Sequence, residues 1–143
     1  MTETIAIAAD HAGYDLKLLL IPELKELGFE VLDLGTSSSD PVDYPDMADA
    51  LARAIEAGRA KRGVLICGTG VGIGIAANRH RWIRAGVCHD ATTARLTRQH
   101  NNANVLALGA RVLGPEVARE CLRVFLATDY EGGRHERRIA KLS

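Results

Sequence analysis

The sequence predicts an α/β fold of the doubly wound, Rossmann-like class, with a five-stranded parallel sheet and helices on both faces. Five short apolar runs alternate with helix-like segments along the 143 residues. Strands of a parallel sheet are covered on both faces, so they read as continuous apolar runs, and a helix usually connects them. No linker, internal repeat or low-complexity tract interrupts the alternation. We therefore expect one domain over residues 1–143.

The expected strands are short apolar runs, each set between helix-like segments. In chain order they are expected at residues 4–9, 29–34, 63–66, 84–88 and 104–108. A Ser-, Asp- and Pro-rich loop over residues 35–44 follows the second run, and a glycine-rich loop follows the third. These two loops are the least regular parts of the predicted fold.

The expected helices are recognised by apolar spacing and by the residues at their ends. They are expected at about residues 16–27, 45–57, 71–78, 91–99, 115–127 and 134–142. Pro22 is expected to kink the first helix and Gly28 to end it. Pro45 suits the first turn of the second helix, and Asp90 the N-cap of the fourth. One face of the first helix is marked by five leucines at helical spacing: Leu16, Leu19, Leu20, Leu24 and Leu27.

Composition argues against several kinds of function. Aromatic residues make up 4%, which disfavours a platform for stacking bases. The 18 basic and 18 acidic residues balance, so we expect neither a nucleic acid nor a membrane surface as partner. No apolar run is long enough to span a bilayer. Three cysteines without scaffold spacing, and no signal peptide, predict reduced thiols in the cytoplasm.

Residues 67–72, Cys-Gly-Thr-Gly-Val-Gly, are the most informative segment. A glycine-rich turn between a strand and a helix aims several backbone N–H groups at one point, which favours an anion there. Such a cradle favours the thiolate form of Cys67 at its mouth. Thr69 offers a hydroxyl to a ligand or caps the next helix. The segment lacks the lysine of a P-loop, and the alternative is a tight turn that only permits close packing.

Other polar residues follow the expected strands, where ligands of doubly wound folds bind. Asp10 and His11 follow the first strand, His89 the fourth and Arg111 the fifth. The alternative for Asp10 and His11 is a helix cap beside a surface imidazole. Cys88 and Cys121 are expected in the core, and His80 on the solvated surface.

The chain carries two further polar groups. His100 and Asn101 begin an amide-rich stretch before the fifth strand, and Arg134 and Arg138 stand at helical spacing in the last segment. Arginines so spaced can close on one anion, or they can belong to a solvated helix. No His, Cys or carboxylate motif indicates a metal, and we expect no metal and no cofactor.

The chain resembles the sugar-phosphate isomerases of the ribose-5-phosphate isomerase B type, a family that also contains galactose-6-phosphate isomerase subunits. The resemblance runs essentially end to end. The matching stretches are Ala9-Asp10-His11-Ala12-Gly13, Asp43-Tyr44-Pro45, Ile66-Cys67-Gly68-Thr69-Gly70-Val71-Gly72, Arg98-Gln99-His100-Asn101, Asn104-Val105-Leu106-Ala107-Leu108-Gly109-Ala110-Arg111 and Tyr130-Glu131-Gly132-Gly133-Arg134-His135.

The resemblance implies metal-independent interconversion of ribose 5-phosphate and ribulose 5-phosphate through an enediolate. It also implies a homodimer, with tetramers possible, whose active site lies at the interface between chains. One alternative is the same chemistry on a four- or six-carbon sugar phosphate: erythrulose 4-phosphate, allose 6-phosphate or galactose 6-phosphate. The other is a module that binds a sugar phosphate without turning it over.

The resemblance also implies roles for single residues. Cys67 matches the base; some members place a glutamate further along its loop, and residues 71–74 here contain no acid. Thr69 matches a hydroxyl that assists proton transfer, and His100 with Asp10 matches the ring-opening group. The remaining matches concern binding. They are Gly68, Gly70, Val71, Gly72 and Asn101 for the enediolate oxygens, His11, Arg111, Arg134 and Arg138 for phosphate, and Tyr44 for the sugar. The resemblance gives no role to Arg137, His89 or His135.

Overall fold

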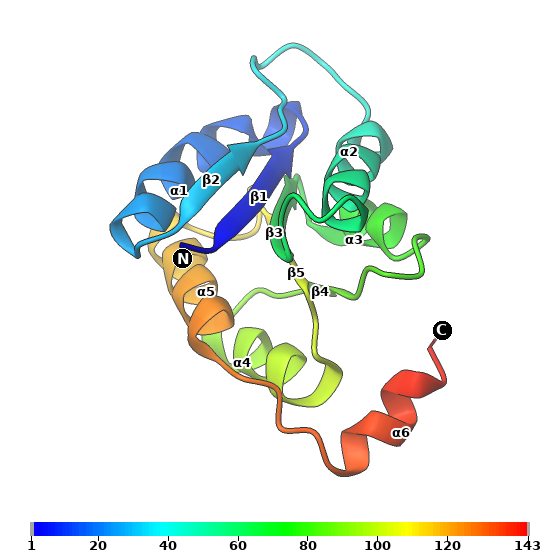
Figure 1. Cartoon of the computed structure of the whole chain (residues 1–143). Coiled ribbons are helices and arrows are strands. Elements are labelled where there is room, and N and C mark those ends of the chain that lie inside the picture. The colour runs from blue at the N-terminus through cyan, green and yellow to red at the C-terminus, as the bar shows by residue number, and fades with distance from the viewer. Residues whose placement is uncertain (1, 143) are drawn as a thin grey trace.

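The doubly wound prediction is confirmed. The computed structural model describes residues 2–142 and contains a five-stranded parallel sheet in the order β2-β1-β3-β5-β4 (Figure 1). The strands are β1 (Thr4–Ala9), β2 (Glu30–Asp33), β3 (Arg62–Cys67), β4 (Ala85–Val87) and β5 (Val105–Gly109). Strand order reverses between β1 and β3, and the crevice beyond such a reversal is where doubly wound folds bind ligands.

The helices form one layer on each face of the sheet. They are α1 (Tyr14–Glu26), α2 (Tyr44–Glu56), α3 (Val71–Ala77), α4 (Ala91–Asn101), α5 (Pro115–Ala127) and α6 (Arg134–Ala140). Side chains of α1, α4 and α5 share one apolar cluster with one face of the strands, while α2 and α3 pack on the other face. Helix α6 contacts α4 and stands off from the rest of the chain (Figure 1).

The central strands are apolar throughout because both of their faces are covered. Ile5 and Ile7 of β1 face α1 and α5, whereas Ala6 and Ala8 face α2 and α3, and all four are fully buried. The outer strand β2 is not apolar throughout, because its residues are half-buried or exposed. Because both faces are buried, the central strands appear in the sequence as continuous apolar runs.

Two details of α1 differ from the prediction. Its buried leucines are Leu16, Leu20 and Leu24, with Lys17 buried beside them, whereas Leu19 and Leu27 are exposed. Residues four apart stay on one face of a helix, and the other two leucines fall outside that narrow stripe. The helix also begins at Tyr14, after a short 3₁₀ turn, and runs unbroken past Pro22.

Candidate active site

The carboxyl ends of β1 and β3 lie side by side. The backbone N–H of Asp10 donates to the carbonyl of Ile66 at 3.1 Å. Gly13 lies directly on Ile66, since a Cβ at this glycine would come within 2.7 Å of the Ile66 carbonyl oxygen. Only glycine permits this approach. The turn after β1 is therefore held next to the residue that precedes Cys67.

Asp10 and His11 are both tied to backbone at this edge. Asp10 is 7% exposed, and its Oδ1 accepts the N–H of Gly13 at 3.1 Å. His11 Nδ1 accepts the N–H of Val42, in the loop before α2, at 3.2 Å. A neutral imidazole that accepts at Nδ1 carries its proton on Nε2. The loop thereby leaves the Nε2–H of His11 as the donor for a ligand.

Cys67 is the last residue of β3, at the base of the glycine loop. Its sulfur accepts the N–H of Gly70 at 3.1 Å, and the residue is 5% exposed. Gly70 adopts a left-handed conformation with φ of 81°, which turns the chain so that this N–H faces back toward the strand. The Thr69 hydroxyl accepts the N–H of Val71 at 3.2 Å. The N-cap of α3 is Gly70 and not Thr69, so the Thr69 hydroxyl bonds the first helical N–H from the residue before the cap.

The glycine loop is enclosed by residues from three other elements. A Cβ at Gly68 would come within 3.3 Å of Arg111 Nη1, and one at Gly72 within 2.8 Å of the Tyr44 ring. His89 Nε2 lies 3.2 Å from the Thr69 carbonyl oxygen. Residues from the ends of β1, β3, β4 and β5 therefore meet at one edge, as predicted.

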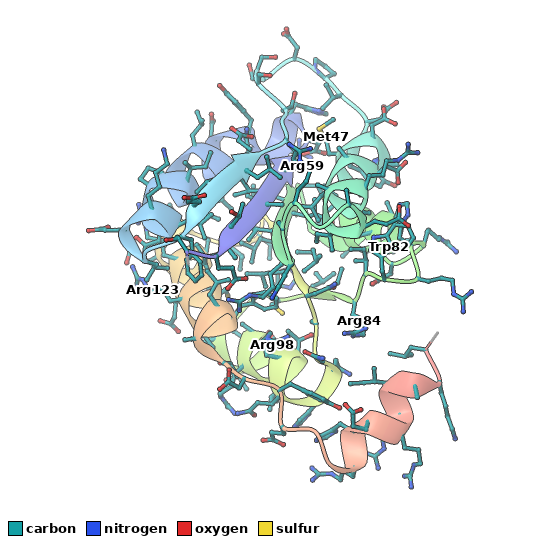
Figure 2. All side chains as sticks on the ribbon, in the orientation of Figure 1. Met47, Arg59, Trp82, Arg84, Arg98 and Arg123 are labelled. Atoms are coloured by element: carbon teal, nitrogen blue, oxygen red, sulfur yellow. The ribbon has the colours of Figure 1, made fainter. Side chains whose placement is uncertain are left out.

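Within one chain His100 and Asp10 lie at opposite edges of the sheet, so the pairing that the resemblance implies stays a prediction about the interface between two chains. Helix α4 starts after β4 and runs back, so its end at Asn101 stands near the start of β5. Arg84, labelled in Figure 2, donates from Nε to the carbonyls of Asn101 and Asn102 at 3.1 and 3.2 Å. At 3.3 Å per residue the two edges are about 15 Å apart.

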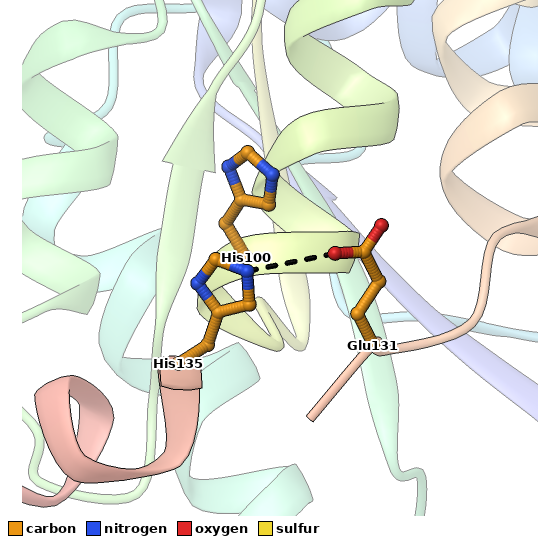
Figure 3. Close-up of side chains that lie close together, drawn as sticks. All are labelled: His100, Glu131 and His135. Carbon is orange, nitrogen blue, oxygen red and sulfur yellow. Dashed lines mark ion pairs between the residues drawn. The ribbon is translucent and has the colours of Figure 1, made fainter. Parts of the chain in front are cut away.

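A second polar cluster surrounds His100 (Figure 3). The rings of His100 and His135 stack with centroids 4.5 Å apart and planes 19° apart. His135 is 5% exposed, and its Nε2 lies 3.5 Å from Glu131 Oε1 without a hydrogen-bond partner. Donor atoms of His100, Glu131 and His135 all lie within 4.8 Å of one another. Sequence spacing gave no sign of this metal-compatible group except the four-residue step from Glu131 to His135.

The predicted site residues thus divide into two groups. Around Cys67 the chain gathers Asp10, His11, Tyr44, Gly68, Thr69, Gly70, Val71, Gly72 and Arg111. Around His100 it places Asn101 on α4, and Arg134 and Arg138 on the neighbouring α6. A cavity of about 530 Å³, lined in part by Arg84 and Asn101, opens beside β4 on this second side.

Two further cysteines and one further histidine lie away from the glycine loop. Cys88 and Cys121 are buried core residues as expected, and burial raises the pKa of each thiol to about 11. The prediction for His80 is wrong. Its side chain is only 20% exposed, and its Nε2 lies 2.8 Å from Asp49 Oδ1, because α2 passes close beneath the loop after α3.

Comparison with known proteins decides the family. The family model for Ribose/Galactose Isomerase matches residues 5–142 of the chain. The chain belongs to the ribose/galactose isomerase family. It is therefore an isomerase, and the predicted resemblance is confirmed. Across residues 2–142, every helix is too short or too polar to cross a membrane.

Individual relatives match this ribose/galactose isomerase over nearly their whole length. Ribose-5-phosphate isomerase B of Escherichia coli K12 is 48% identical over 139 residues, covering 97% of this chain and 93% of the relative. D-erythrulose-4-phosphate isomerase of Pectobacterium atrosepticum is 44% identical, covering 97% and 92%. The crystal structure of a ribose 5-phosphate isomerase from Thermotoga maritima superposes with a TM-score of 0.96 at 48% identity, covering 99% and 98%.

Proposed function

We propose that this isomerase interconverts ribose 5-phosphate and ribulose 5-phosphate through an enediolate, with Cys67 as the base and no metal. The observation that carries the proposal is the position of the Cys67 sulfur. It stands at the reversal of strand order and accepts the N–H of Gly70 at 3.1 Å. Amide donors at this point stabilise negative charge on sulfur and on a nearby oxygen.

The proposed proton transfers balance within the substrate. The Cys67 thiolate removes the proton from C2 of the open-chain aldose and leaves an enediolate. The same sulfur then returns that proton to C1, which yields the ketose. The Thr69 hydroxyl carries the second proton from the oxygen on C2 to the oxygen on C1. Backbone N–H groups of residues 68–72 stabilise the enediolate charge with little reorganisation.

Phosphate binding is the proposed role of the basic residues. Arg111 lies over Gly68, and His11 can donate from Nε2–H because its Nδ1 accepts the N–H of Val42. A planar guanidinium group can donate two parallel hydrogen bonds to phosphate oxygens. Holding the remote phosphate fixes C1 and C2 near the sulfur, so binding energy serves orientation.

We propose that the complete site needs two chains. The second group lies at the edge of the sheet opposite Cys67 and consists of His100, Asn101, Arg134 and Arg138. In one chain these residues are too far from Cys67 to contact the same substrate. A homodimer can bring this second group of one chain to the Cys67 edge of its partner. The exposed apolar side chains of Val71, Ile75 and Val87 line a surface hollow of about 290 Å³ beside the glycine loop and offer a contact surface. Tetramers would pair such dimers.

The compartment we propose is the cytoplasm. Cys67, Cys88 and Cys121 are all free thiols. A reducing compartment preserves such thiols, and catalysis by Cys67 requires that its sulfur stay unoxidised.

The decisive test is the Cys67→Ala variant. Removing the base should lower kcat for ribose 5-phosphate by about a thousandfold, within the range of general acid–base catalysis. Calorimetric binding of the sugar phosphate should survive, because the arginines and the amide cradle remain. The matched control is Cys88→Ala, which removes a core thiol and should keep near-normal turnover. Activity retained in Cys67→Ala would overturn the mechanism.

Two further measurements separate the alternatives. Treatment with a chelator should leave the rate unchanged if no metal takes part. A panel of four-, five- and six-carbon sugar phosphates, compared by kcat/KM, tests the substrate; the similarity to an erythrulose-4-phosphate isomerase favours the four-carbon sugar as the second candidate. Tight binding without exchange of deuterium at C2 would indicate a binding module instead.

A further inference from the structure

We infer that His100, Glu131 and His135 bind one divalent cation of the zinc class, and that the bound cation inhibits the enzyme by occupying His100. The second part rests on the proposed function, in which His100 opens the sugar ring. The first part depends only on the geometry of the three side chains (Figure 3). They come from the end of α4, the loop after α5 and the start of α6.

The His135 side chain has a buried nitrogen without a hydrogen-bond partner. This side chain is buried to more than nine-tenths, yet Nε2 has no hydrogen-bond partner. It stands 3.5 Å from Glu131 Oε1, beyond good hydrogen-bonding distance. Buried polar atoms are usually paired, and each exception needs an explanation. A cation between the imidazole and the carboxylate would satisfy both groups.

The donor set selects the ion. Two imidazoles and one carboxylate form a ligand set common in zinc sites with an open fourth position. Calcium and magnesium prefer sites made almost entirely of oxygen, so this set disfavours them. The fourth position would be filled by water.

The side chains must move only modestly to close on an ion. Zinc bonds of about 2.0–2.1 Å in tetrahedral geometry bring donor atoms to roughly 3.4 Å from one another, against the observed limit of 4.8 Å. The stacked rings are nearly parallel, so the His100 ring has to turn. His100 is half-buried and Glu131 exposed, and these two can adjust around the fixed His135. The Glu131 N–H donates to the Gln99 carbonyl at 3.1 Å, which keeps the loop beside α4.

Nearby positive charge weakens cation binding at this site. Arg134 and Arg138 lie on the same short helix as His135 and oppose a cation electrostatically. We therefore expect binding that chelators reverse readily. When His100 binds the ion, its nitrogen has no lone pair left to accept a proton from the sugar.

The binding test uses calorimetry with zinc chloride on the chelator-stripped, full-length protein. We expect one zinc per chain, and a loss of affinity of more than about tenfold in Glu131→Gln and in His135→Gln. Two control variants should bind as the unmodified protein does. His80→Gln alters the other close histidine–carboxylate pair, and Cys67→Ala removes the thiol that zinc would otherwise seek. Equal affinity in all five proteins, or the absence of a zinc site, would overturn the proposal.

A second readout separates this site from the proposed function. Cobalt bound in place of zinc should give the visible absorption of a tetrahedral site, which Glu131→Gln should abolish. Glu131 is exposed, so this variant should fold even if His135→Gln does not. In turnover assays zinc should inhibit the unmodified enzyme and a chelator should restore the rate, with Glu131→Gln markedly less sensitive. Binding without inhibition would disprove the role of His100, and a protein without isomerase activity would still report on the site.

Discussion

The three cysteine side chains of this chain occupy two different environments. Cys88 and Cys121 lie within the apolar layer that α1, α4 and α5 form on the sheet, whereas Cys67 ends a strand and accepts a backbone N–H. Burial raises the pKa of both core thiols to about 11, since the thiolate would lose its hydration. The environment of each sulfur, and not its residue type, separates a packing role from a chemical one.

This contrast predicts a loss of stability in alkaline solution. The unfolded chain releases the thiol protons near pH 9, while the folded protein keeps those of Cys88 and Cys121 until about pH 11. Their contribution to the free energy of unfolding is therefore fully present below pH 9 and is lost as the pH rises through about 11. Urea denaturation at pH 8 and pH 10.5 should show the fall. A variant with alanine at both positions should show a smaller one, and an equal fall would contradict the assignment.

At the scale of elements, the glycine loop is held in shape by its neighbours. Gly109, at the end of β5, lies under the loop so closely that a Cβ would come within 2.5 Å of the Thr69 carbonyl oxygen. The N–H groups of Ala110 and Arg111 donate to the carbonyls of Cys67 and Gly68, both at 2.9 Å. The end of β5 therefore fixes the backbone that presents the amide donors.

Gly109→Ser should damage both stability and activity. The new side chain meets backbone that cannot rotate away, so the loop has to shift, at a cost of roughly 1–3 kcal/mol in the free energy of unfolding. We expect kcat to fall further than KM rises, because the displaced amides act mainly on the enediolate.

Gly114→Ser is the matched control for that experiment. A Cβ at Gly114, the N-cap of α5, meets nothing within 4 Å, and serine is a favoured N-cap residue. This variant should keep normal kinetics and equal or higher stability in urea denaturation. A similar loss of activity in both variants would show that loop contact is not the cause.

At the scale of the whole molecule, the two groups of candidate site residues lie at opposite ends of the strands. Helix α4 runs antiparallel to the strands, so it carries His100 about one strand length from Cys67. An isologous dimer repeats each contact twice, so one interface can complete two equivalent sites.

Mixing two inactive variants tests this arrangement. Cys67→Ala and His100→Ala should each be inactive alone. Random exchange of chains gives mixed dimers in half of the population, each with one intact site, so about a quarter of the unmodified activity should return. Activity measured after mild unfolding and joint refolding checks the prediction. No recovery, despite mixed dimers shown by mass spectrometry, would place both residues in one chain's site.

Much of the fold was predictable because local patterns and burial agree. The central strands read as apolar runs since both faces are covered, and Asp90 caps α4 as predicted, with Oδ1 accepting the Thr93 N–H at 2.7 Å. The polar residues after β1, β3 and β5 were predictable as a group, because parallel strands end at one edge. Leu19 and Leu27 were misplaced because a five-leucine face is wider than the stripe that the sheet covers.

By itself the sequence determined the alternation of strands and helices, the family and the grouping of polar residues around Cys67 at one edge of the sheet. Only the tertiary structure decided that His100 lies at the other edge, and that Glu131 and His135 stand beside it. Parallel pairing brings the carboxyl ends of the strands to one edge of the sheet. The residues that follow the strands can therefore be grouped from the sequence alone. Contacts between α4 and the segment leading into α6 depend on how helices pack, which spacing along the chain does not encode.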